Sequence, residues 1–399
     1  MTNLTHKIHI YPNKKQEELL QKSCDVARYV YNWGLAKWNK EYEEGNKPNF
    51  YQIKKEFNVL KKEECPFVME VSKCVSEYAL MDLKSAFTKF FRKQSKHPQF
   101  HKKEIDNTFS LSNDQFKIVD KQYIKIPKSK QLIKLSEPLR FDGKIMKATI
   151  SKKANKWFVS ISIETTINEL KETNNVIGID LGVKEIATCS NGIIFDNPKW
   201  IKKIERKFKH KQRQISKQKR GSNRRNRNKL RIQKLYYKLT NQRNDYLHKL
   251  TKYIIRTNDI ICLEDLNIRG MVKNHNLAKA ISNVSLYELR RQFEYKAKLY
   301  GKEIKYIDKW FPSSKTCSNC GNIKNDLTLK DRIYKCQKCG LEIDRDFNAS
   351  LNILRQAMSE VKHEENHKQI DLINLTFLKI SNINQLDSMN RESKLNIIK

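Results

Sequence analysis

Four cysteines near the C-terminal end of the chain have the spacing of metal ligands. Two residues separate Cys317 from Cys320 and Cys336 from Cys339, and fifteen residues lie between the two pairs. Two Cys-x-x-Cys turns at this separation can place four thiolates around one ion, with Zn–S distances of about 2.3 Å. Four protein ligands leave no open coordination position. We therefore expect one structural Zn²⁺ without a catalytic role.

The same cysteines could instead form disulfides, as in a secreted protein. The first fifteen residues contain no continuous apolar stretch of the kind found in a signal peptide. No other segment approaches the length and apolar character of a membrane span. The remaining five cysteines have no paired spacing. We therefore favour a reducing compartment, in which these cysteines are free thiols and the four paired ones bind zinc.

Three acidic residues occupy comparable positions along the chain. Asp180 ends a predicted buried strand, Glu264 ends another, and Asp346 opens the last predicted helix. In the ribonuclease H arrangement, strand-end carboxylates converge and hold two Mg²⁺ ions about 4 Å apart. One ion would activate the attacking water and the other would stabilise the leaving 3′ oxygen. Hard oxygen ligands of this kind suit Mg²⁺.

Each of these acids has a competing interpretation. Asp180 could simply form the turn before Gly182. Glu264 and Asp265 are adjacent, so strand alternation sends their side chains to opposite faces and only one can enter the site. We favour Glu264, which shares a face with Ile260 and Cys262, although alternation alone does not choose between the two faces.

Asp344 competes in the same way with Asp346 for the third position. Asp346 is nearer the helix defined by the apolar residues from Ala349 to Ala357, and an acid at a helix N-terminus is favoured by the helix dipole. We therefore favour Asp346.

The composition indicates a polyanionic partner. The chain has 399 residues, with 80 Lys and Arg against 44 Asp and Glu, a formal net charge of +36. Such a charge favours contacts with phosphates through counterion release. Ribosomal and membrane-surface proteins share this bias. The 16 Tyr and 17 Phe add surfaces on which bases can stack. We expect nucleic acid as the partner, and no membrane.

The N-terminal part of the chain has the pattern of a strand, a helical block and then further strands. Alternation near residues 7–11 ends at Pro12, apolar steps of three and four residues run from about 14 to 96, and alternation returns between 107 and 163. Turn residues divide this last segment into five strands. We expect a small β-barrel with helices inserted into it.

A second unit begins near residue 174. Strands are predicted at 176–180, 186–189, 260–264 and 304–307, with helices at 286–300 and from 346 onward. A basic helical stretch, 201–256, is broken near 221–223, and residues 202–234 hold sixteen Lys or Arg against one acid. We expect a helical hairpin that follows phosphates, with Arg220, Arg224 and Arg225 among its nucleic-acid contacts.

A set of motifs in a fixed order resembles the TnpB (OrfB) proteins of bacterial insertion sequences, which are related to the type V CRISPR effectors. The resemblance covers most of the chain, and each motif is weak alone but specific in this order. The motifs are Gly178-Ile179-Asp180-Leu181-Gly182, Glu264-Asp265-Leu266, Ser313-Ser314-Lys315-Thr316-Cys317-Ser318-Asn319-Cys320-Gly321 and Asp344-Arg345-Asp346-Phe347-Asn348-Ala349.

The resemblance implies an RNA-guided DNA endonuclease encoded by a transposable element. It implies a RuvC-like site in which Asp180, Glu264 and Asp346 hold two Mg²⁺ ions, with Asn348 supporting Asp346 by a hydrogen bond. A transposon-derived guide RNA would pair with double-stranded target DNA beside a short motif. We expect a monomeric ribonucleoprotein, with self-association possible, in the bacterial cytoplasm and associated with the nucleoid.

The expected fold class is a multidomain α+β protein. A β-barrel wedge domain comes first and contains an inserted helical recognition domain. A RuvC-like ribonuclease H fold (α/β) follows and contains an inserted zinc ribbon. The family's recognition helices face the motif duplex, which makes Tyr51, Lys73, Ser76 and Glu77 candidate nucleic-acid contacts. The expected segments are a wedge at 1–12 and 106–170, a recognition domain at 13–105, a nuclease domain at 171–310 and 342–358 with its basic insert at 201–256, a zinc ribbon at 311–341, and a weakly ordered tail at 359–399.

Two other functions remain open at this point. A guided DNA-binding repressor would need no nuclease activity, although the intact acidic trio argues against it. A DNA strand-transfer transposase would use a similar trio, so the acids alone do not exclude it.

Overall fold

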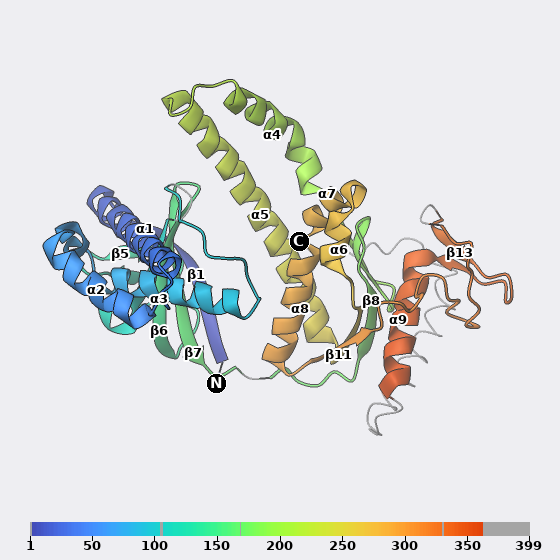
Figure 1. Ribbon diagram of the computed structural model, residues 1–399. Coiled ribbons are helices and arrows are strands. Elements are labelled where there is room, and N and C mark those ends of the chain that lie inside the picture. Colours follow the sequence, from blue (N-terminus) through green and yellow to red (C-terminus); the bar gives the residue numbers. More distant parts are fainter. Residues whose placement is uncertain (1, 104–106, 168, 329–330, 362–399) are drawn as a thin grey trace. The chain divides into compact units, whose positions relative to one another are not determined.

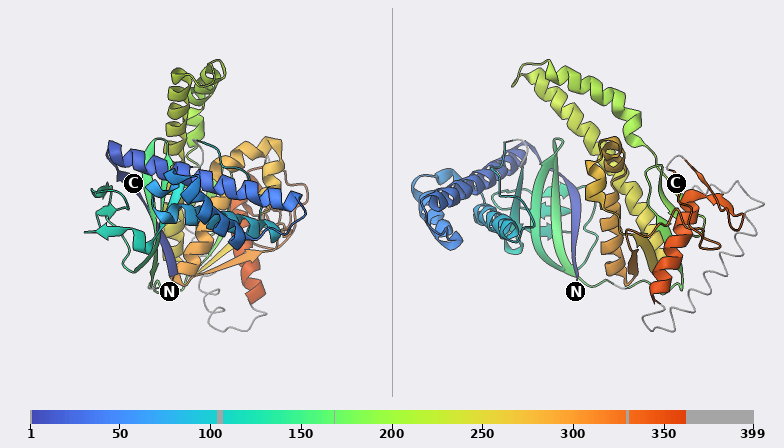
Figure 2. Two further views of the ribbon diagram at one scale, coloured as in Figure 1. Left: turned by 60° about the vertical axis from the view of Figure 1, so that its left-hand side comes forward. Right: turned by 45° about the vertical axis from the view of Figure 1, so that its right-hand side comes forward.

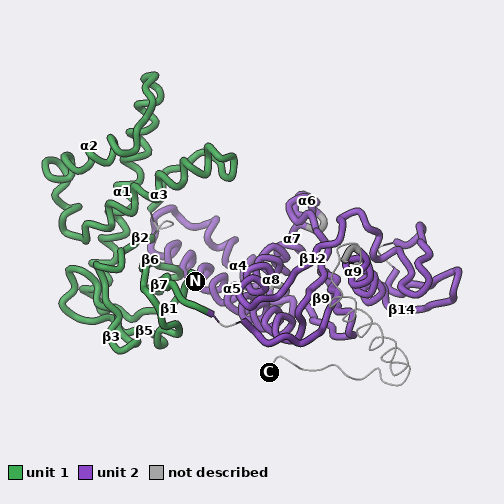
Figure 3. Tube along the Cα trace, turned by 90° about the horizontal axis from the view of Figure 1, so that it is seen from below, with its two compact units in different colours: residues 1–166 green, residues 167–399 purple. Residues whose placement is uncertain are grey.

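The computed structural model describes residues 2–361 except 104–106, 168 and 329–330. The chain is a mixed α/β protein that divides into two compact units, Met1–Thr166 and Ile167–Lys399 (Figure 3). The tail expected from residue 359 lies almost entirely outside the described residues, and residues 359–361 are the end of a helix. Among the helices that the structure describes, none is long and apolar enough to cross a membrane.

Unit 1 contains a curled seven-stranded sheet in which the N-terminal strand is internal (Figures 1 and 2). Strand β1 pairs antiparallel with β7 along nearly its whole length and with β5 at its end. The hydrogen-bonded order is β2-β6-β7-β1-β5-β4-β3. The strands are β1 (Thr2–Tyr11), β2 (Thr108–Ser112), β3 (Lys117–Val119), β4 (Tyr123–Lys125), β5 (Ile133–Leu135), β6 (Lys144–Lys153) and β7 (Lys156–Thr165). Strand β5 was not expected.

The predicted helical block of unit 1 consists of three helices, α1 (Lys14–Glu43), α2 (Phe50–Glu63) and α3 (Lys73–Phe91), with a short 3₁₀ helix at Pro66–Glu70. Helix α1 begins with a capping box in which Asn13 Oδ1 accepts the Gln16 N–H and Gln16 Oε1 accepts the Asn13 N–H, each at 2.9 Å. The apolar faces of α1 and α3 share one core with the inner face of the sheet.

Unit 2 contains a five-stranded sheet of order β10-β9-β8-β11-β12. Strands β8, β11 and β12 are parallel, and β9 and β10 continue the sheet antiparallel. The strands are β8 (Val176–Asp180), β9 (Glu185–Cys189), β10 (Ile194–Asp196), β11 (Ile260–Glu264) and β12 (Glu303–Ile307). The predicted strands of this unit are confirmed, and β10 is an addition.

Helices cover both faces of this sheet. Alternate residues of β8 and β11, such as Ile179 and Leu263, pack on α5 (Asn223–Thr257) and α8 (Leu286–Tyr300). The intervening residues, such as Cys262, pack on α9 (Arg345–Val361). Helix α4 (Trp200–Ser216) and α5 form the expected long hairpin (Figure 1). Two short helices between β11 and α8, α6 (Ile268–Lys273) and α7 (His275–Val284), were not expected.

Gly178 lies where α9 contacts β8 most closely. A Cβ atom at this position would stand 2.3 Å from the Ser350 carbonyl oxygen and 2.7 Å from the Leu354 backbone nitrogen. Both are backbone atoms, so no side-chain rotation could relieve the overlap. The glycine therefore sets the distance between the strand that ends in Asp180 and the helix that begins near Asp346.

We predict that Gly178→Ala lowers the free energy of unfolding by about 1–3 kcal/mol, the usual cost of overpacking a core, because α9 must move away from β8. The midpoint of urea unfolding measures this change.

Gly34→Ala is the matched control. Its new Cβ would meet only the Cδ2 atoms of Leu80 and Leu83, each at 2.9 Å, which are ends of flexible side chains. The gain of about 1 kcal/mol in helix propensity would offset part of that crowding. Equal losses in the two variants would contradict a special constraint at Gly178.

Candidate functional site

Asp180 and Glu264 share one face of the unit 2 sheet. Ile179 and Leu263 are aligned in the parallel pair β8 and β11, so the next residues, Asp180 and Glu264, are neighbours at the strand ends. Both lie on the α9 face, since they are two residues beyond Gly178 and Cys262 respectively. Asp346 is in the first turn of α9. The structure thus brings the three predicted acids to one edge of the sheet.

The electrostatics of this cluster show that its negative charges interact. Burial, followed by the charges of Glu264 and Asp346, raises the pKa of Asp180 to about 8. Burial also raises the pKa of Glu264, although a hydrogen bond from the Ser313 hydroxyl to Glu264 Oε1 opposes this shift. Such a site favours bound protons or a cation.

Asp265 is engaged away from the cluster. Its Oδ1 forms an ion pair at 2.7 Å with Nη1 of Arg290, on α8, and its side chain is half exposed. The two adjacent acids therefore point to different surroundings, as alternation requires, and Glu264 is the one that joins Asp180.

Asp344 caps α9. Its Oδ1 accepts the backbone N–H groups of Asp346 at 2.9 Å and Phe347 at 3.0 Å, two of the amides that a helix leaves unpaired at its start. One carboxylate oxygen of Asp344 is thus bound to backbone amides. After burial and Glu264, the charge of Asp346 and then the weaker influence of Asp344 raise the pKa of Asp180.

Arg345 is the cation nearest this trio in sequence. Its Nη2 and Nε lie 3.0 and 3.2 Å from Asp346 Oδ1. Its charge lowers the pKa of Asp180, which partly compensates the cluster. Carboxylate oxygens are the donors that a hard divalent cation prefers, and Arg345 is the cation whose charge opposes those of the neighbouring acids at Asp180.

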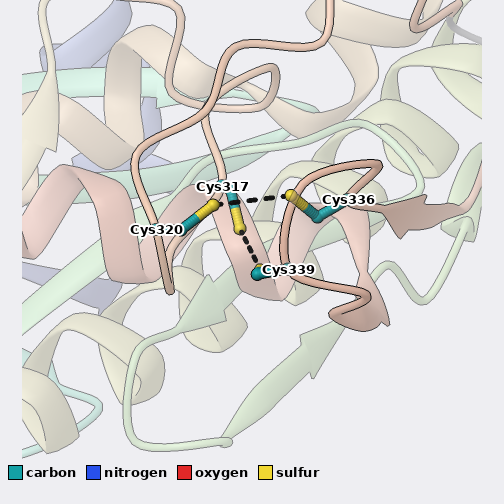
Figure 4. A group of neighbouring side chains, drawn as sticks. All are labelled: Cys317, Cys320, Cys336 and Cys339. Atoms are coloured by element: carbon teal, nitrogen blue, oxygen red, sulfur yellow. Dashed lines mark hydrogen bonds between the residues drawn. The ribbon is translucent and has the colours of Figure 1, made fainter.

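The four predicted cysteine ligands form one cluster in the part of the chain that the structure describes. Their sulfur atoms all lie within 4.8 Å of one another, with 3.6 Å between Cys317 and Cys339 and 3.5 Å between Cys320 and Cys336 (Figure 4). A tetrahedral Zn²⁺ with Zn–S bonds of about 2.3 Å separates its sulfurs by about 3.8 Å. The cluster therefore fits a four-thiolate metal site.

Backbone amides favour thiolates in the second pair of cysteines. The Leu341 N–H, followed by smaller contributions, lowers the pKa of Cys339 to about 6, and the Cys339 N–H is the largest cause that lowers the pKa of Cys336. Tyr334 is fully buried beside Cys317 and Cys336, and its hydroxyl donates to the carbonyls of Lys315 and Asn322, each at 3.1 Å. The strands β13 (Ile333–Lys335) and β14 (Glu342–Asp344) complete this segment.

Asn348 joins α9 to the first cysteine turn. Its Oδ1 accepts the Ser318 N–H at 2.9 Å and its Nδ2 donates to the Thr316 carbonyl at 2.7 Å. This differs from the direct hydrogen bond to Asp346 that we expected, because Asn348 is two residues after Asp346 in α9 and side chains two residues apart do not face each other on a helix. Asn348 thus supports Asp346 by fixing the adjoining segment.

Sequence reasoning missed two further residues of this region. Asn352, one turn after Asn348, donates from Nδ2 to the carbonyls of Ser313 at 2.8 Å and Thr316 at 2.6 Å. Ser313 contacts Glu264 through its hydroxyl. The i, i+4 spacing of two asparagines on an otherwise apolar helix face was the available signal.

The four candidate contacts in unit 1 have different surroundings. Tyr51, on α2, is 70% exposed and receives a hydrogen bond of 3.0 Å from Lys84 of α3. Lys73 is exposed and Glu77 is half buried. Ser76 is buried, and its hydroxyl donates to the Lys73 carbonyl at 3.0 Å. The free protein therefore presents Tyr51 and Lys73 to solvent but not Ser76.

The three candidate arginines lie at the tip of the α4–α5 hairpin. Arg220 and Arg224 are exposed. Arg225 is half buried, and its Nη1 donates to the carbonyls of Ile215 and, at 2.7 Å, Gln218 at the end of α4. Arg225 thus stabilises the helix terminus, a position at which a cation is favoured.

Comparisons with known proteins agree along most of the chain. A family model described as a probable transposase, OrfB of IS605, matches residues 158–275. A Cas12f1-like TNB domain model matches residues 287–353. A helix-turn-helix model of the OrfB group matches residues 1–47, where the described residues form β1 and the single long helix α1.

Two curated relatives align over most of their own length. One from Streptomyces pristinaespiralis, named "Putative RNA-guided DNA endonuclease", is 34% identical over 88% of this chain and 89% of its own. InsQ of Escherichia coli K12 carries the same description and is 27% identical over 87% and 90% of the two chains. A solved Cas12f1–sgRNA–target DNA complex shares the fold, with a TM-score of 0.54 at 17% identity over 86% and 83% of the two chains.

We predict that Asp180→Asn stabilises the protein at pH 8.5 in buffer without added Mg²⁺. The folded-state pKa of about 8 lies above the ordinary value of about 4, so ionisation penalises the fold increasingly between these two pH values. The gain should exceed about 1.4 kcal/mol, the equivalent of one pKa unit, and should vanish near pH 4. Urea unfolding at both pH values measures it.

Asp265→Asn is the control, because this neighbouring acid is exposed and ion-paired. Its effect should stay within about 1 kcal/mol at either pH. A wild-type protein no less stable than Asp180→Asn at pH 8.5 would show that the cluster carries no unfavourable charge.

Proposed function

The chain belongs to the TnpB (OrfB) family of insertion-sequence proteins, and we propose from this premise that it is an RNA-guided DNA endonuclease. Two relatives that align over most of their length bear that description. The observation that carries the proposal is the convergence of Asp180, Glu264 and Asp346 at one edge of a mixed sheet.

The proposed reaction is hydrolysis of a DNA phosphodiester by two Mg²⁺ ions. When bound, these ions activate a water molecule and stabilise the leaving 3′ oxygen. Asp180 and Glu264 would supply ligands from neighbouring strand ends, and Asp346 would supply a third from the first turn of α9. Ser313 orients Glu264 through its hydroxyl. Burial of Asp180 and Glu264 limits the competition of bulk water for this site.

The four-cysteine segment would hold one structural Zn²⁺. We propose that residues 311–341 are a zinc ribbon inserted between the second and third acids. In the structure β14 pairs with β13 of this segment and leads directly into α9, so the ribbon's folded hairpin extends to residue 344. The metal would stiffen the segment that leads into Asp346 while remaining outside the chemistry.

We assign the remaining parts by the same proposal. The curled sheet of unit 1 would be the wedge domain, α1 to α3 the recognition domain, and the sheet of unit 2 with its flanking helices the RuvC-like nuclease domain. The α4–α5 hairpin has almost no acids to oppose its basic residues. It suits the backbone of a guide RNA–DNA heteroduplex, since base pairing supplies the sequence specificity.

The partners would be a transposon-derived guide RNA and double-stranded target DNA. Arg220, Arg224, Tyr51 and Lys73 are the exposed candidates for contact with them. We propose a monomer within the ribonucleoprotein, acting in the bacterial cytoplasm at the nucleoid.

We predict that Asp180→Ala abolishes target cleavage while guide RNA and target DNA still bind. The substitution removes one metal ligand but leaves the basic surfaces unchanged. Protein purified with its RNA and supplied with Mg²⁺ should cut a matched target in the wild-type form only. Sequencing of the copurified RNA should give a constant scaffold with a variable end.

Asp265→Ala serves as the control and should retain cleavage, because that acid pairs with Arg290 outside the cluster. Cleavage by the Asp180→Ala variant at the wild-type rate would refute the site. Binding without cleavage by the wild type would indicate a repressor, and strand joining by RNA-free protein would indicate a transposase.

We predict that Cys336→Ser lowers the bound zinc from one ion per chain to less than half and reduces soluble yield. The hydroxyl of serine does not replace a thiolate ligand at neutral pH. Metal analysis of the purified protein measures this. Cys262→Ser changes a buried cysteine outside the cluster and should keep the metal. An unchanged zinc content in Cys336→Ser would rule out the four-thiolate site.

A further inference from the structure

Trp310 lies in an exposed loop between β12 and the first cysteine pair. Its indole is 80% exposed, the largest exposed fraction among the exposed large hydrophobic side chains of the described residues. Singly exposed apolar residues are ordinary on protein surfaces. The surroundings of Trp310 distinguish it from such residues.

Both ends of this loop are tied to Glu264. Ile307, the last residue of β12, is aligned with Glu264 across the parallel pair β11 and β12. Ser313, at the other end, donates its hydroxyl hydrogen bond to Glu264. Trp310 is three residues from each, and three residues span at most about 11 Å. The most exposed aromatic residue is therefore held close to the carboxylate cluster.

Hydrogen bonds and packing hold the loop in one conformation. Asp308 Oδ1 accepts the Trp310 N–H at 2.6 Å, and the Asp308 carbonyl accepts the Phe311 N–H at 3.1 Å. Phe311 packs against the core beneath α9, and Asn352 holds the Ser313 carbonyl. The neighbours of Trp310 are thus fixed, while its own ring remains in solvent.

The charges around the ring suit an anionic ligand with a flat group. The Lys309 ammonium stands over one face of the indole ring, 5.1 Å from its centroid. A base would therefore stack on the opposite face, and the ammonium would meet a phosphate beside the ring. Asp308, the acid beside it, turns a carboxylate oxygen toward the backbone amide of Trp310. An unpaired nucleotide has both a phosphate and an open π-face, whereas bases within a duplex are already stacked.

On these observations, and resting on the proposed function, we infer that Trp310 is a stacking platform for an unpaired base of the DNA strand that enters the carboxylate cluster. Lys309 meets a phosphate of the same strand. Trp310 is a positioning residue: it holds the strand so that the neighbouring phosphodiester lies at Asp180 and Glu264, without touching the reacting atoms.

The test places 2-aminopurine at single positions around the mapped cut of a matched target. Complexes of protein, guide RNA and target are assembled without Mg²⁺, so that no cleavage occurs. Wild-type protein should quench the fluorophore at one position near the cut, Trp310→Tyr should keep this quenching, and Trp310→Ala and Trp310→Leu should lose it. With Mg²⁺, Trp310→Ala should cut about 5- to 150-fold more slowly, the range for loss of one stacked base.

Tyr42→Ala is the matched control, because Tyr42 is 72% exposed in the other unit beside Glu41, Glu43 and Glu44. It should match the wild type in both readouts. Equal quenching and cleavage by Trp310→Ala and wild type would overturn the inference while leaving the endonuclease intact. Loss of guide RNA or of monomeric state in Trp310→Ala would also overturn it. Failure of the wild type to cut would instead refute the proposed function.

Discussion

Helix α9 lies against strand β8 at a distance that leaves no room for a Cβ atom on Gly178. Two residues after Gly178 along the strand, a distance of about 6.6 Å, the chain reaches Asp180. One turn before Ser350 along the helix, about 6 Å, it reaches Asp346. The distance from Gly178 to Asp180 along β8 thus nearly equals the distance from Ser350 to Asp346 along α9. A single close contact therefore brings acids that are 166 residues apart in the sequence to the same edge of the sheet.

In the absence of a cation, the proximity of these ionised acids destabilises the folded state. Burial and like charge raise the pKa of Asp180, and burial raises the pKa of Glu264. A fold that optimised stability alone would separate them or place more cations beside them than Arg345. The surrounding structure instead fixes them through sheet register, the Asp344 cap and the Ser313 hydroxyl. Unfavourable charge held in place by favourable packing is typical of functional sites.

The sequence predicted what depends on short periodic patterns. The strands ending in Asp180 and Glu264 follow from continuous apolar runs, the helical hairpin from helical spacing, and the four-cysteine cluster from Cys-x-x-Cys pairs. It could not predict interactions that depend on tertiary placement. Helix position favoured Asp346 over Asp344, but the sequence did not show that Asp344 caps α9. It also did not show that Asn348 bonds the backbone of the first cysteine turn instead of the acid.

The ribbon is attached at both ends to elements that carry the acids. Its first end, at Ser313, contacts Glu264 and Asn352, and its last strand ends in Asp344, which caps the helix of Asp346. Asn348 closes the link between α9 and the first cysteine turn. A metal held by the four thiolates would therefore act on the carboxylates mechanically, by limiting how far the two ends of this segment can separate. The loop that carries Trp310 ends at Ser313, so Trp310 is linked to Glu264 and Asn352 through the same residue. The thiolate cluster, the carboxylates and the exposed indole thus form one connected unit, in which each group depends on the position of Glu264 or of α9.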